Sequence, residues 1–446
     1  MPELFAGVAS VDISPKKGHD LGGYPHFPRP NTGIHDPLIA SCIYLKADDV
    51  QVALVTLDLL FFSKRNVSIV RTAVEKVCSI PGANIFISCS HTHSGPWASG
   101  KLDEESLVND SQSEDSSYVE SLNANLIDLI CQAKHHLFAA RLGYGMKQCG
   151  AEKGIGGNRR DRNGISDPSV NVIAIQDNDF NIRGIYANYA LHPTFIHEDS
   201  DVVTADYPGY IRATLNDSFP TAVFGFTQGT SGNQSSRYFR QGQSFEEAAR
   251  VGGELGHSVI SVINQMKFTD NVLIRTSSQT IPLYLRAMPG IEEAANRRNE
   301  DRNIYEKLIA EKASYLAIQN ANVKMLGSED LFGYALLQSK NLPIDLVVNE
   351  RDPEIMAIAL NDLLLIGLPG EVFVEFGLEI KQKSNFDLTI VAELANGCMP
   401  GYVCTKKAIA EGGYEVDTSM VHPDMGEMFV HAALQNAQNL KLDCAK

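Results

Sequence analysis

The sequence predicts an α/β protein with a mixed β-sheet core and flanking helices. Short apolar segments with strand character alternate with segments of helical spacing along most of the chain. Two apolar segments, residues 84–88 and 184–191, run into histidine-containing loops, as strands at one edge of an α/β sheet often do. No internal repeat or low-complexity linker divides the chain, so we expect residues 1–446 to form a single domain.

The positions of strands and helices follow from the period of the apolar residues. Short alternating or continuous apolar runs bounded by turn residues predict strands, and 3.6-residue spacing predicts helices. The expected strands are 5–13, 38–46, 50–57, 84–88, 140–150, 169–176, 184–191, 222–227, 271–285, two within 355–366, and 388–392. The expected helices are 65–77, 117–137, 208–216, 245–266, 370–383 and 424–439. A charged helical pattern at 291–324 predicts an excursion over residues 288–326, and the acidic stretch 102–116 predicts a loop or lid.

The charge and composition exclude several classes of partner. The net charge of −16, from 54 acidic and 38 basic residues, disfavours nucleic acid. No basic run indicates stable membrane association, and no apolar stretch reaches the roughly 20 residues that span a bilayer. The N-terminus resembles no secretion signal, and the 8 cysteines are scattered, with Cys78 and Cys131 in apolar helical patterns typical of a core. We therefore expect a cytoplasmic protein, with the charged helical excursion facing solvent or a second copy of the chain in a homo-oligomer.

The most informative segment is residues 85–96, in which a buried strand runs into His91-Thr-His93 and stops at a Ser-Gly-Pro turn. Side chains two residues apart in extended chain point the same way, so both histidines can face one pocket. This geometry suits a metal ligand beside a second polar group. The alternative is a pair of surface histidines in a loop, and the flanking strand favours the metal site.

Three further loops carry candidate site residues. His192 follows the strand 184–191 and repeats the layout of His91. The Gly/Ser/Asn-rich turn 228–236 presents serines that a base or metal could activate, although its composition alone indicates only a polar turn. Glu371 begins a helix, where an acidic residue is expected from the helix dipole and can also be a metal ligand. Two histidines and one carboxylate form a common catalytic zinc set, but spacing alone does not bring these loops together.

Five segments, in order, resemble the neutral (non-lysosomal) ceramidase family. They are residues 90–96 (Ser-His-Thr-His-Ser-Gly-Pro), 190–192 (Ala-Leu-His), 228–235 with Gly-Asn-Gln-Ser, 369–371 (Pro-Gly-Glu), and 396–402 followed by Gly-Gly-Tyr-Glu at 412–415. The opening strand around residues 7–13 and the Asn-Arg pair at 158–159 also resemble family segments. The resemblance implies the fold of the ceramidase catalytic domain, in a short form without the family's C-terminal β-sandwich domain.

The resemblance also implies roles for individual residues. It implies a Zn2+ ion bound by four ligands, namely His91, His192, Glu371 and Tyr402. His93 would stabilise an oxyanion or support a ligand, Arg159 would help to hold substrate, and Ser235 would attack an amide carbonyl. The family has Pro-Asn where this chain has Ser236-Arg237, so the choice between Ser235 and Ser236 stays open. The ligand set favours zinc, with manganese and iron as alternatives.

These observations predict a zinc-dependent hydrolase that cleaves an amide bond of a small soluble substrate. No exposed aromatic cluster suited to docking on a membrane is apparent in the sequence, which favours a soluble amide over ceramide. Two alternatives stay open. The first is a true ceramidase, and the second is a metal-binding protein without turnover, in which Ser236-Arg237 marks a nucleophile loop that has lost its function.

Overall fold

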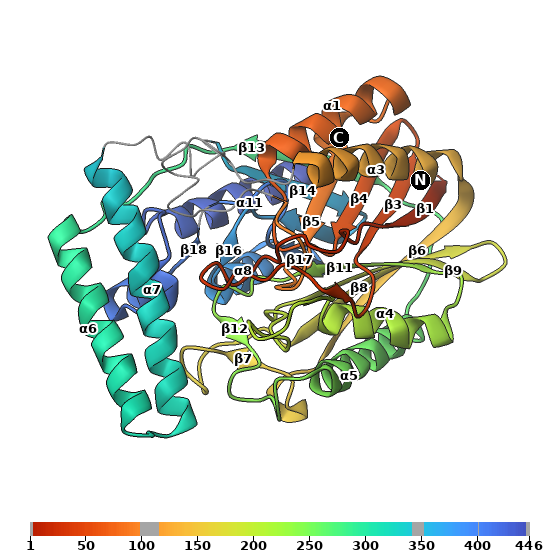
Figure 1. Ribbon diagram of the computed structural model, residues 1–446. Coiled ribbons are helices and arrows are strands. Elements are labelled where there is room, and N and C mark those ends of the chain that lie inside the picture. The colour runs from red at the N-terminus through yellow and green to blue at the C-terminus, as the bar shows by residue number, and fades with distance from the viewer. Residues whose placement is uncertain (1–2, 99–115, 341–351, 400, 443–446) are drawn as a thin grey trace.

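The computed structural model describes residues 3–98, 116–340, 352–399 and 401–442, and confirms the mixed α/β class (Figure 1). The acidic segment predicted as a loop or lid falls almost entirely outside these residues. The longer strands are β1 (Leu4–Asp12), β3 (Ile39–Ala47), β4 (Val50–Leu57), β5 (Ile85–Cys89), β6 (Phe138–Gln148), β8 (Ser169–Asp177), β9 (Ile182–Tyr189), β11 (Val223–Gln228), β13 (Ile274–Thr280), β14 (Glu354–Leu360), β15 (Leu363–Gly367) and β17 (Leu388–Ala392). The main helices are α1 (Lys64–Cys78), α3 (Ser116–His135), α4 (Tyr207–Ser218), α5 (Phe245–Ile263), α6 (Ile291–Ala310), α7 (Tyr315–Ser339), α8 (Val374–Lys383) and α11 (Met425–Leu442).

The larger sheet has eight strands in the order β11-β9-β8-β6-β1-β3-β4-β5. Its outermost pairs, β11 with β9 and β4 with β5, are parallel, and the inner pairs are antiparallel. The sheet is bent so far that β11 also packs beside β3, β4 and β5. One tie across this contact is the hydrogen bond that Ser41 Oγ donates to the carbonyl of Phe224, at 2.7 Å.

The smaller sheet has four strands in the order β13-β14-β15-β17, of which β15 and β17 are parallel. An apolar core joins it to the larger sheet. Leu54 and Phe86 from the larger sheet share this buried cluster with Ile358 and Leu365 from the smaller one. Because β14 and β15 are buried at every position, they read as continuous apolar runs rather than as alternating patterns.

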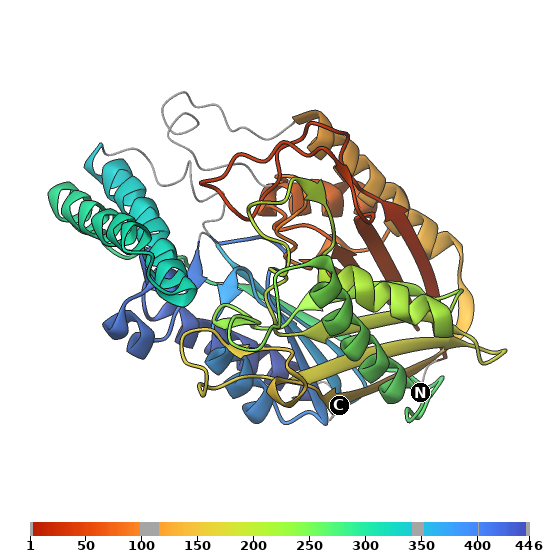
Figure 2. The ribbon, with the colours of Figure 1, turned by 60° about the horizontal axis from the view of Figure 1, so that its bottom comes forward.

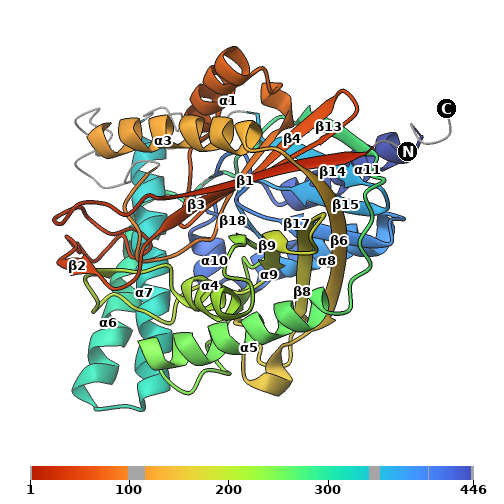
Figure 3. The same cartoon turned by 90° about the vertical axis from the view of Figure 1, so that its right-hand side faces the viewer.

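Helices cover the outer faces of both sheets (Figure 3). Helices α1 and α3 pack on β1 and β3 around one apolar cluster, and α4 and α5 pack on β8, β9 and β11 around another. Helices α8 and α11 cover the smaller sheet. None of the helices in the described ranges is long and apolar enough to cross a bilayer.

The charged excursion is an antiparallel hairpin of α6 and α7 at one side of the body (Figure 2). The sequence pattern at 291–324 predicts a single charged helical segment, whereas the structure has two helices and continues to Ser339. The second helix carries the weaker charge pattern of the two, which is why its extent was not predicted. Ion pairs join the helices, among them Lys324 to Asp301 at 2.9 Å. The hairpin packs back on the body, where Leu331 of α7 shares a buried apolar cluster with Met420 of the body.

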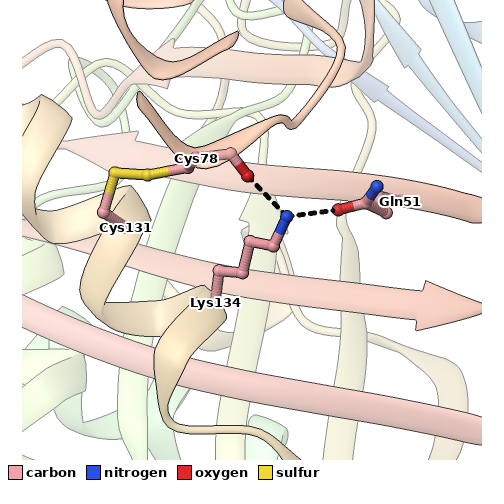
Figure 4. The surroundings of a disulfide bond; sticks show 4 residues. All are labelled: Gln51, Cys78, Cys131 and Lys134. Carbon is pink, nitrogen blue, oxygen red and sulfur yellow. Dashed lines mark hydrogen bonds between the residues drawn. A yellow bond between two sulfur atoms is a disulfide. The ribbon is translucent and has the colours of Figure 1, made fainter. Parts of the chain in front are cut away.

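A disulfide links Cys78, at the end of α1, to Cys131 in α3 (Figure 4). Both residues lie in or against the apolar cluster under these helices, as predicted, but their pairing was not predicted. Lys134 Nζ donates to the carbonyl of Cys78 at 2.5 Å and to Gln51 at 3.0 Å, so the crosslink is also tied to β4. Disulfides are typical of oxidising compartments, which argues against the predicted cytoplasmic location.

Candidate active site

The site forms where the carboxyl ends of β5, β9, β11, β15 and β17 meet. The chain after β17 ties three of these strands together through backbone hydrogen bonds. Glu393 donates to the carbonyl of Gln228 at the end of β11, at 3.0 Å, and Asn396 donates to that of Ile87 in β5, at 2.7 Å. The carboxyl ends of parallel strands are the usual ligand-binding edge of α/β sheets. Loops far apart in the sequence therefore reach one place.

Three histidines lie together at this edge. Their ring nitrogens, from His91, His93 and His192, are within 4.8 Å of one another, in a group that can hold a metal ion. The Nε2 atoms of His91 and His93 are 3.3 Å apart. His91 is buried and its backbone has φ of 68°, a left-handed conformation that is strained for a residue other than glycine. The strained turn directly after β5 is what brings two histidines of one short segment to the same point.

Backbone carbonyls fix the orientation of both buried rings. His91 Nδ1 lies 3.1 Å from the carbonyl oxygen of Leu60, and His192 Nδ1 lies 2.9 Å from that of Ser231. A carbonyl oxygen only accepts, so each Nδ1 carries a proton and each Nε2 is the atom left to bind a metal. This is the arrangement that metal-binding histidines usually have.

Glu371 and Tyr402 meet the histidines through a short parallel pairing. Strands β16 (Glu371–Val372) and β18 (Tyr402–Val403) place these two residues opposite each other. Glu371 Oε2 is 3.3 Å from His91 Nε2 and 3.1 Å from His192 Nε2. The Tyr402 ring stacks beside that of His192, with centroids 6.3 Å apart. All four ligands predicted from the resemblance are thus neighbours, and His93 stands among them.

The ionisation of these groups suits a cation. Burial favours the neutral acid of Glu371, but the charge and hydrogen bonds of His91 and His192 outweigh it and hold the pKa of Glu371 well below its usual value. Burial and the nearby Arg159 lower the pKa of His192 to about 4. Burial, together with His91 and His192, also lowers the pKa of His93. An ionised carboxylate beside imidazole nitrogens is the donor set that a divalent metal binds, and binding would displace any proton that Nε2 shares with Glu371.

Arg159 lies beside this group and is held by Glu415. Its Nε is 2.7 Å from Glu415 Oε1, its Nη2 donates to the carbonyl of Gly232 at 2.7 Å, and its Cζ lies 5.0 Å from the Tyr402 ring centre. Burial opposes the charged form, but Tyr402 and Glu415 outweigh it and raise the pKa of Arg159. A fixed cation therefore stands next to the predicted ligands, where it can stabilise negative charge.

The serine loop enters the site through its backbone. Strand β12 (Gln234–Ser235) pairs with β7 (Gly157–Asn158), and the carbonyl of Gln234 lies 3.2 Å from His192 Nδ1. Ser235 Oγ accepts from the backbone of Arg237 at 3.2 Å. Ser236 Oγ is buried and has no hydrogen-bond partner among the residues that the structure describes. Both serines lie within two residues of a group that holds His192, so the choice between them stays open.

Two buried carboxyl groups near the site were not predicted from the sequence. Glu393 Oε1 accepts from Ser231 Oγ at 2.5 Å, and Oε2 accepts from the backbone of Val372 at 2.7 Å. Burial raises its pKa well above the usual value. Glu415 holds both Arg159 and Arg160. Glu393 holds Ser231, whose carbonyl orients His192, and Glu415 holds Arg159. In the sequence, only the Gly-Gly-Tyr-Glu segment pointed to Glu415, and no motif pointed to Glu393.

Several other histidines and carboxylates lie outside the group. Asp58 accepts from the backbone of Ile39 and pairs with Arg212, and Asp206 caps α4. Among the loop histidines, His26 contacts Asp330 of α7 at 3.1 Å, and His35 stacks on Phe245. None of these contacts is to a predicted metal ligand.

Comparison with known proteins shows the fold. No protein-family model matches the sequence, and no curated protein sequence matches it. The chain does resemble the crystal structure of neutral ceramidase from Pseudomonas aeruginosa, with a TM-score of 0.75 and 17% identity over 99% of this chain and 75% of that one. A structure described as ceramidase complexed with C2 gives a TM-score of 0.72 and 15% identity, over 99% and 76% of the two chains. The predicted neutral-ceramidase-like fold is confirmed.

Proposed function

We propose that this protein is a zinc-dependent hydrolase that cleaves a non-peptide amide bond of a small soluble substrate. The observation that carries the proposal is the convergence of His91, His192 and Glu371, with both Nδ1 atoms directed to backbone carbonyls. Four ligands, namely His91, His192, Glu371 and Tyr402, would hold the ion. The nearby Nε2 of His93 makes it either a fifth donor or a group that supports the site.

A bound zinc ion would supply Lewis acidity and a lowered pKa for a hydroxyl or water. The remaining work falls to the side chains. Arg159, fixed by Glu415, would orient the amide oxygen and stabilise the negative charge that develops on it, which is worth several kcal/mol in comparable sites. His93, as a neutral imidazole, would donate to the same oxygen from the ring nitrogen that carries its proton. Ser235 would be the attacking hydroxyl, with Ser236 or a water as the alternative.

The fold neighbours favour one other function. Both are described as ceramidases, which supports a true ceramidase as the second candidate. Ceramide is a lipid amide, so the two candidates differ in substrate rather than in the bond cleaved. A small soluble amide is preferred because the sequence shows no aromatic cluster suited to docking on a membrane, where ceramide would be bound. The cytoplasmic location stays a prediction, and the Cys78–Cys131 disulfide argues against it.

Elemental analysis of the purified protein tests the metal, and an amide panel tests the activity. We expect about one zinc per chain, lost in His91→Ala and kept in His431→Ala, which removes an exposed histidine of α11. The zinc-loaded protein should hydrolyse at least one of a set of N-acyl amino compounds, cyclic amides and ceramide. Retention of stoichiometric zinc by His91→Ala would sink the site assignment, and hydrolysis of ceramide alone would favour the second candidate.

A further inference from the structure

The serine loop also carries two arginines, Arg237 and Arg240. Both are partly buried. Arg240 Nη1 donates to His197 Nε2 at 3.3 Å and lies 3.4 Å from the carbonyl oxygen of Thr194. No ion pair to Arg237 or Arg240 is formed within the part of the chain that the structure describes. A partly buried guanidinium without a carboxylate is unusual, because burial disfavours an unpaired charge.

Both arginines lie next to the candidate active site. On one side, Arg240 contacts His197, whose ring lies 5.5 Å from that of Tyr24, and the Tyr24 ring lies 5.1 Å from His93. On the other side, Arg237 comes two residues after Ser235 and is close enough to Arg159 for their charges to repel. Arg237 and Arg240 are also electrostatic neighbours of each other. Arg237 thus lies beside the predicted nucleophile, with its backbone N–H on Ser235 Oγ at 3.2 Å, and Arg240 reaches the histidines through His197 and Tyr24.

The anionic groups nearby already have partners. Glu415 interacts with Arg237 but is held by Arg159 and Arg160, at 2.7 and 2.8 Å. Glu198 pairs with His197 Nδ1 at 2.9 Å. That contact leaves His197 Nε2 as the acceptor for Arg240, so His197 does not neutralise the arginine. Burial lowers the pKa of both arginines, helped by repulsion from Arg159 at Arg237 and from Arg237 at Arg240. Among the described residues, the two guanidinium groups therefore stand together without a carboxylate of their own.

We propose that the amide substrate carries a carboxylate near the scissile bond and that Arg237 and Arg240 bind it. This inference rests on the proposed function and narrows its substrate class to acidic amides. Planar guanidinium groups match a carboxylate geometrically, and such charged hydrogen bonds are about twice as strong as neutral ones. The carboxylate would stand in the amine half, as in an N-acyl amino acid, or in the acyl half, as in a succinamic acid.

Matched ligand pairs test this directly. N-octanoylglycine is compared with N-octanoylglycinamide, and N-butylsuccinamic acid with its neutral diamide, so that each pair differs only in the carboxylate. We expect the zinc-loaded protein to bind one acid at least about tenfold more tightly than its neutral match in calorimetric titration, the scale of one charged hydrogen bond. The pair that shows the preference identifies the half of the substrate that carries the acid.

Variants then locate the preference. Arg237→Gln and Arg240→Gln should each lower the ratio of acid to neutral affinity about tenfold, while Arg237→Lys keeps part of it and Arg65→Gln, an exposed arginine of α1, leaves it unchanged. Equal affinities for acid and neutral ligands in the unaltered protein would overturn the inference. So would equal losses for both ligands in the glutamine variants. Because the readout is a ratio of affinities and product formation is measured separately, failure of this inference is distinguishable from failure of amide hydrolysis.

Discussion

The candidate active site, below called the centre, and the α6–α7 hairpin both contain charged groups. The groups are buried and fixed by the backbone in the first, and exposed in the second. In the centre, His91 and His192 are each about 1% exposed, and backbone carbonyls fix both rings. In the hairpin, charges meet other side chains at the surface, as in the pair of Lys307 and Glu311 at the end of α6, whose side chains are 72% and 57% exposed. Buried groups fixed by the backbone are preorganised, whereas exposed ion pairs contribute little and are screened by salt. The centre should therefore be sensitive to single changes that the hairpin tolerates.

The largest effect is expected from the carboxylate at the centre. Glu371→Gln keeps the shape but removes the negative charge between two buried histidines, so zinc should be lost and turnover should fall by about 10³-fold or more. Elemental analysis and steady-state kinetics check this. Glu375→Gln, in the first turn of α8, is the matched control. Full zinc content in Glu371→Gln would show that the histidines alone suffice.

The crosslink between α1 and α3 should matter for stability and not for the chemistry. Replacing both Cys78 and Cys131 by serine removes a loop constraint over a sequence separation of 53, worth about 4 kcal/mol in the chain-entropy estimate. Urea unfolding of the oxidised protein, with and without reductant, measures it. Identical midpoints under the two conditions would mean that the disulfide does not form in solution.

Arg159→Lys separates charge from geometry beside the ligands. Lysine keeps the charge but cannot contact Glu415 and Gly232 at once, as Arg159 does. We expect kcat to fall about 10²-fold with zinc content unchanged. An unchanged kcat would assign Arg159 a purely structural role.

The smallest effect is expected at the hairpin, where Asp330 of α7 meets His26. Burial disfavours the His26 charge, but Asp330 outweighs it and raises the pKa of His26. The stabilisation is therefore fully present below the unfolded pKa of about 6.5 and is lost as pH rises through the higher folded value. Asp330→Asn should destabilise the protein by less than about 1 kcal/mol at pH 6 and by less still at pH 8. Thermal unfolding at both pH values measures this, and an equal effect at the two would rule out the charged pair.

Features that have a local signal in the sequence could be predicted, and features that depend on distant partners could not. His91 and His192 were found because each directly follows an apolar strand, which is a local signal. The contact of Glu371 with Tyr402 depends on the pairing of β16 with β18, whose members are 31 residues apart, and no local pattern encodes it. Only the family resemblance supplied that link. Glu393 and the Cys78–Cys131 pair were missed because their partners lie far away in the sequence, and the full length of α7 was missed because its charge pattern is weak.

The left-handed backbone of His91 has a consequence for how such a site persists through evolution. Glycine adopts φ of 68° without strain, whereas a side chain there costs roughly 1–2 kcal/mol. Folding alone would favour glycine at this position, so the proposed metal binding would be what retains the imidazole. Chains that lose the activity should therefore drift at position 91 first, toward small residues that relax the turn. A histidine at this position in a related chain is a sign that selection still acts on the reaction.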